Sequence, residues 1–71
     1  MIYKLSAIIE QEGTWYVAVC PELDVVSQGT SLEEALTNLR EAVQLYLECA
    51  DPSEISLPTQ PPFLTTLEVA M

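Results

Sequence analysis

The sequence predicts an α+β fold, a two-layer β-β-β-α-β sandwich in which one helix covers an antiparallel sheet. Short segments before residue 30 and after residue 62 have the alternation and composition of strands. Between them, apolar residues recur at helical spacing over nearly 20 positions. A chain of 71 residues is too short for more than one domain, so we expect residues 1–71 to form a single domain.

Residues 2–10 and 14–20 are predicted to form a hairpin. In the first strand, Leu5 and Ile9 fall on one face with Tyr3 and Ala7. Gly13 can adopt the positive φ that a tight connection requires. The second strand is rich in aromatic and β-branched residues, and two sets alternate along it: Trp15, Val17 and Val19 against Tyr16, Ala18 and Cys20.

A short third strand is predicted over residues 25–28, ending at Gly29. Pro21 ends the second strand because it has no N–H to donate to a ladder. The turn that follows it is short, so the third strand most simply pairs antiparallel with the second.

The helix is the strongest prediction, and it should run from the Thr30-Ser31 cap to about residue 49. Thr30 with Glu33 and Ser31 with Glu34 form two overlapping capping boxes. Pro52 lies just beyond the expected end. One face carries an apolar stripe, made of Leu32, Leu36, Leu39, Val43, Tyr46 and Leu47.

Residues 51–62 contain four prolines and are expected to form an irregular, extended connection. Strand composition returns in residues 63–70. This fourth strand is expected either at an edge of the sheet or in a partner's sheet.

Charge excludes several classes of function. Lys and Arg number 2 and Asp and Glu number 11, a net charge of −9, which disfavours binding to nucleic acid or to an anionic membrane and favours basic partners. The absence of His excludes His-dependent catalysis within the chain.

No segment suits a signal peptide or membrane span, so we expect a cytoplasmic protein. Cys20 and Cys49 have no metal-site or redox-motif spacing and are expected to be free thiols.

One helix can cover only one sheet face, so the other face is expected to be exposed or to meet another chain. We therefore expect a homo-oligomer, a dimer or tetramer. On the second strand that face carries either Tyr16, Ala18 and Cys20 or the opposite set, and the candidate interface consists of Trp15, Val17, Val19 and Leu45. Leu45 falls near the polar side of the helix, where it is equally well explained as a single exposed leucine.

The acidic residues form several pairs, and Glu22, Asp24, Glu33 and Glu34 are the candidate partner-binding residues. We expect the turn and the helix start to lie together as one acidic patch; solvated surface acids are the simpler alternative. No pair has the surroundings of a metal site. Neither a catalytic residue, a metal nor a cofactor is expected.

The run from Trp15 to Gly29, followed by Thr30-Ser31-Leu32-Glu33-Glu34-Ala35, resembles the HicB-type antitoxin family. The helix and the segment from Phe63 to Ala70 extend the resemblance over nearly the whole chain. It implies a partial ribonuclease-H-like domain without catalytic acids that blocks a small basic mRNA-interferase toxin. Many members carry a C-terminal DNA-binding module, which we do not expect in a sequence that ends at Met71.

The first functional hypothesis is therefore a non-enzymatic, antitoxin-like binding protein. The alternative is a solitary oligomeric protein with a structural or regulatory role and no toxin. A metal-dependent nuclease is the weakest hypothesis, because that chemistry needs several carboxylates converging on metal ions.

Overall fold

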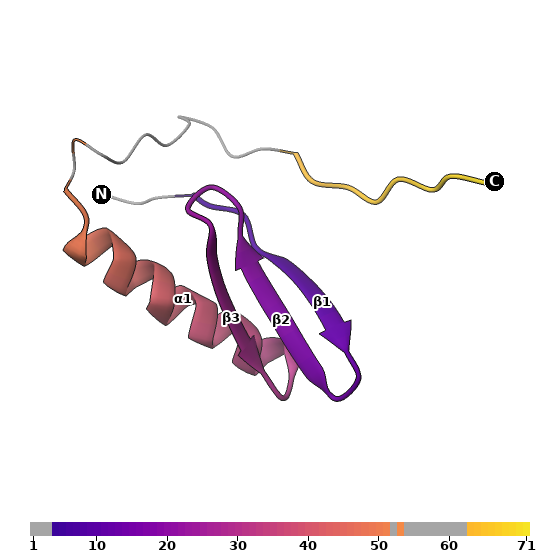
Figure 1. Ribbon diagram of the computed structural model, residues 1–71, viewed down its shortest axis with the longest axis horizontal. Helices are drawn as coiled ribbons and strands as arrows, with labels where there is room; N and C mark the ends of the chain where they lie inside the picture. Colours follow the sequence, from indigo (N-terminus) through magenta and orange to yellow (C-terminus); the bar gives the residue numbers. More distant parts are fainter. Residues whose placement is uncertain (1–3, 52, 54–62) are drawn as a thin grey trace.

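The computed structural model describes residues 4–51, 53 and 63–71. Three strands, β1 (Ile8–Glu12), β2 (Trp15–Cys20) and β3 (Val25–Gly29), precede one helix, α1 (Leu32–Cys49). The strands form an antiparallel sheet in the order β1-β2-β3. The helix lies across one face of this open sheet (Figure 1). The predicted α+β class, with one helix on an antiparallel sheet, is confirmed.

A two-residue turn joins β1 to β2, since Glu12 pairs with Trp15. Gly13 takes a φ of +61° there, a conformation that favours glycine. The strand β1 begins at Ile8, later than the predicted start at residue 2; residues 1–3 lie outside the described part. Extending the register would set Ser6 opposite Pro21, which cannot donate to a ladder.

The connection from β2 to β3 is a four-residue turn over residues 21–24. The Leu23 N–H donates to the Cys20 carbonyl at 3.3 Å, which closes the turn. Asp24 has a φ of +56°, a left-handed conformation that Asp tolerates better than most residues. The strand β3 then pairs antiparallel with β2 from Val25 to Gly29, as predicted.

Helix α1 begins with a modified form of the predicted capping boxes. The Ser31 hydroxyl accepts a hydrogen bond from the Glu34 N–H at 3.0 Å, which makes Ser31 the N-cap. The Glu34 carboxylate reaches back to the Thr30 N–H at 3.0 Å and to the Thr30 hydroxyl at 3.3 Å. One carboxylate therefore joins the β3–α1 connection to the first helical turn.

The core between helix and sheet consists of Ala18 and Cys20 on β2 and Ala35 and Leu39 on α1. Small side chains on both layers allow the backbones to approach closely. The approach is close at Gly29, because a Cβ atom there would lie 2.6 Å from the Ala35 nitrogen. Partly buried apolar residues surround this core: Leu5, Ile9, Tyr16, Leu23, Val25 and Val43.

The C-terminal segment differs from the prediction of a fourth strand at the edge of this sheet. Residues 63–71 have no strand pairing and are exposed throughout. They run as an extended chain outside the sheet (yellow in Figure 1). The sheet of the described chain thus has three strands, and a place in a partner's sheet stays a prediction. In the described part, no helix is both long and apolar enough to cross a membrane.

Candidate functional site

Glu22 lies in the β2–β3 turn and has a structural role in this fold. Both of its carboxylate oxygens accept the Ser6 N–H, at 3.0 and 3.1 Å, and the Cys20 thiol donates to the same group at 3.5 Å. Partial burial raises the pKa of Glu22, but the hydrogen bonds from Ser6 and Cys20 lower it by more, and the net shift is downward. The carboxylate is thus the acceptor for the Ser6 N–H, which lies before the start of β1 and its ladder.

The four candidate partner-binding acids do not form the single patch that the sequence predicts. Glu22 and Asp24 precede β3, whereas Glu33 and Glu34 follow it. The five residues of β3 separate the two pairs by about 17 Å at ~3.3 Å per residue. Figure 1 shows the turn and the helix start at opposite ends of the sheet. The carboxylates of Glu22 and Glu34 also accept hydrogen bonds within the chain, and Glu34 is exposed like Asp24 and Glu33.

The sheet face opposite the helix is open in the described chain. Because Ala18 and Cys20 face the helix, Trp15, Val17 and Val19 face the other side. Trp15 is 47% exposed, and Val17 and Val19 are half-buried. The pairing register continues this face onto both neighbouring strands, and we call the whole set the open sheet face: Ile8, Glu10, Glu12, Trp15, Val17, Val19, Val26 and Gln28.

The open sheet face is divided into an apolar end and an acidic end. Ile8, Val19 and Val26 form one row across all three strands, and Val26 is 57% exposed. At the other end, Glu10 pairs with Val17 and Glu12 with Trp15. The alternation along β2 predicts that its apolar residues Trp15, Val17 and Val19 share one face, but it does not place the acidic pair Glu10 and Glu12 beside them. Only the register shows which β1 residues share that face.

Leu45 lies on the solvent side of α1 and is 61% exposed. Its position away from the core agrees with the helical spacing. Trp15 and the rest of the open sheet face lie on the other side of the molecule from Leu45, because α1 covers the opposite face of the sheet. The four residues of the predicted interface therefore fall on two separate surfaces.

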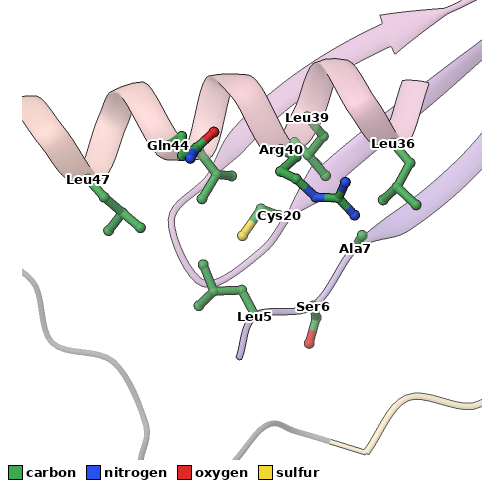
Figure 2. A pocket seen from close by; sticks show the side chains of 10 residues that line it. Leu5, Ser6, Ala7, Cys20, Leu36, Leu39, Arg40, Gln44 and Leu47 are labelled. Atoms are coloured by element: carbon green, nitrogen blue, oxygen red, sulfur yellow. The ribbon is translucent and has the colours of Figure 1, made fainter. Parts of the chain in front are cut away.

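A groove of about 390 Å³ lies between α1 and the chain segment that precedes β1. Leu5, Ser6 and Ala7 line one side, the flank of α1 lines the other, and Cys20 lies between them (Figure 2). The helical flank contributes Leu36, Leu39, Arg40, Val43, Gln44 and Leu47. The helical spacing predicts the apolar stripe that lines this groove. It does not predict the groove itself, which is present because the expected fourth strand does not pair with the sheet of the described chain.

The chemistry of the described residues is limited. No three of their His, Cys, Asp or Glu side chains gather as a possible metal site. Cys20 is buried and Cys49 is exposed, and both are free. Burial raises the pKa of the Cys20 thiol, and the adjacent Glu22 carboxylate raises it further. A thiol that stays protonated is a poor nucleophile, so Cys20 belongs to the core rather than to a reactive site.

Comparison with known proteins gives the family. A UPF0150 protein from Helicobacter pylori strain J99 is 43% identical over 53 residues, which cover 73% of this chain and 74% of the relative. The chain belongs to the UPF0150 family. A second UPF0150 protein, from Synechocystis sp. strain PCC 6803, is 43% identical over 49 residues, which cover 66% of this chain and 62% of that relative. No family model and no solved structure matches the chain. The names of these UPF0150 relatives state no activity.

Proposed function

We propose that this chain is a non-catalytic binding protein that sequesters a small basic protein in the cytoplasm. The observation that carries the proposal is the open sheet face, which presents exposed apolar side chains beside Glu10 and Glu12. The resemblance to HicB-type antitoxins supplies the kind of partner, a small basic mRNA-interferase toxin.

The open sheet face has the two properties that such an interface needs. Buried aromatic and aliphatic contacts supply most of the affinity of an interface, and Trp15 is the type of residue found at its energetic centre. Glu10, Glu12 and a net charge of −9 attract a basic protein and speed its association. The same charge repels RNA, which disfavours a nuclease that acts on it directly.

Affinity purification of the tagged chain from its native host, followed by mass spectrometry, tests the proposal. The expected result is a small protein rich in Lys and Arg that cleaves RNA when purified alone and stops cleaving when this chain is added. A captured protein without ribonuclease activity, or one whose activity the chain leaves unchanged, would contradict the toxin assignment.

Charge variants locate the interface on the captured partner. Replacing Glu10 and Glu12 with Gln should lower the association rate, with less effect on dissociation, and added salt should reduce the difference. Replacing Glu41 and Glu48 with Gln is the matched control, because it removes the same charge from the exposed side of α1. Equal effects from the two pairs would assign the steering to net charge and refute a site on the open sheet face.

The second candidate is a solitary oligomer with a structural or regulatory role and no toxin. The row of Ile8, Val19 and Val26 favours it, because a second copy can cover an apolar row that runs across all three strands. In that case Trp15→Asp should lower the mass in solution, and purification from the host should yield no basic partner.

A further inference from the structure

The groove beside α1 lies where a sheet of this kind would accept another strand. The strand β1 pairs with β2 on one side only, so its other edge has unpaired backbone groups. The chain continues from that edge through Leu5, Ser6 and Ala7, which form one wall of the groove. A strand added along this edge would pair with backbone and place alternate side chains against the helix.

The walls of the groove are suited to apolar side chains. Leu36, Leu39, Val43 and Leu47 line it from the helix, and Leu5 lines it from the opposite side. All five are at least partly buried, although nothing in the described chain fills the space between them. Arg40 is the only cation of the lining.

The described chain contains a segment with the matching properties. Residues 63–71 are extended and exposed, and they are not in the groove of their own chain. Phe63, Leu67 and Val69 fall on one face of this segment with Thr65, a period of two that suits a half-buried strand. Leu67 is 84% exposed and Val69 is 71% exposed. The segment has a single charged side chain, Glu68, which falls on its opposite face with Thr66.

We propose that residues 63–70 of a second copy of the chain lie in this groove as the fourth strand, along the outer edge of β1. Because the two copies are identical, each would insert its segment into the other, giving a closed two-fold dimer. The exchange adds a fourth strand to the three-stranded sheet of each copy. It also covers the apolar face of residues 63–70. It involves neither the open sheet face nor a toxin and is independent of the proposed function.

Two variants of the C-terminal segment test the exchange by mass in solution. The wild-type chain should have the mass of two chains. Leu67→Asp should raise the dissociation constant of the dimer by at least ~100-fold, because it would bury a charge in an apolar groove. Thr66→Asp adds the same charge on the opposite face of the strand and should keep the dimer. Neither position contributes to the core, so both variants should keep the wild-type helical circular dichroism.

Isotope-filtered NMR on a refolded one-to-one mixture of labelled and unlabelled chains identifies which copy fills the groove. The methyl groups of Leu67 and Val69 should show contacts with Leu36 and Val43 between differently labelled chains. Contacts found only within one chain would show that the segment folds back on its own groove, which would overturn the proposal. A monomeric wild type, or a dimer that Leu67→Asp leaves intact, would overturn it as well.

Discussion

Removing the Glu22 carboxylate should destabilise the fold without affecting any exposed binding surface. The substitution Glu22→Ala leaves the Ser6 N–H without the acceptor that now lies at 3.0 and 3.1 Å. A hydrogen bond to a charged group contributes about 1.5–3 kcal/mol, and the low end applies here because Glu22 is only half-buried. We expect a loss of about 1–2 kcal/mol in the free energy of unfolding. Glu22→Gln keeps an oxygen acceptor and should lose about half of that.

The same substitution has a defined pH dependence. The pKa of Glu22 in the folded chain is below its ordinary value of 4.5, so the folded state favours the ionised form. This stabilisation is complete above the pKa of the unfolded chain and is lost as the pH falls through the lower, folded-state pKa. The difference between wild type and Glu22→Ala should therefore be largest near neutral pH and smallest in acid.

Urea unfolding at pH 7 and pH 3, at one protein concentration, measures both effects. Glu41→Ala is the control, because Glu41 is an exposed acid on α1 and should change stability by less than about 0.5 kcal/mol. A Glu22→Ala loss that is the same at both pH values, or no larger than that of Glu41→Ala, would refute the role assigned to the carboxylate.

Three further predictions concern the backbone and the thiols. Gly29→Ala should lower the free energy of unfolding by about 1–3 kcal/mol, because the new Cβ would lie 2.6 Å from the Ala35 nitrogen. Gly13→Ala should cost less, ~1 kcal/mol, because only its positive φ is unfavourable. Thermal unfolding compares the two variants. Ser31→Ala should cost about 0.5–2 kcal/mol by removing the N-cap acceptor, measured by urea unfolding, while helix content stays the same. In native protein a thiol reagent should label Cys49 quickly and Cys20 only after urea is added; rapid labelling of both would show that the core opens readily.

The elements that local patterns determine could be predicted from the sequence. The cap at Ser31, the turn at Gly13 and the end of β2 before Pro21 depend on residues within a few positions of one another. Residues 63–70 have the composition of a strand. Composition does not specify which edge of the sheet would pair with them, or whether that sheet belongs to the same chain or to another copy.

The candidate sites were predicted less completely, because they depend on the spatial arrangement of the elements. The acids around β3 were predicted to be neighbours, yet a strand of five residues separates them. Glu22 looked like a surface acid, since its role depends on Ser6, a residue 16 positions earlier. The alternation along β2 did predict which side chains share the open sheet face, but only the register with β1 adds Glu10 and Glu12 to it.

The order β1-β2-β3 also bears on how quickly the chain folds. Each strand pairs with the next one along the chain through a turn of two or four residues, and α1 follows directly and packs chiefly on β3 and β2. Such short loops lose little entropy on closure, and contacts close in sequence favour fast folding. The sheet and helix should therefore form in a rapid unimolecular step. Pairing between two chains would follow as a slower step whose rate depends on concentration, so dilution would separate folding from assembly in time.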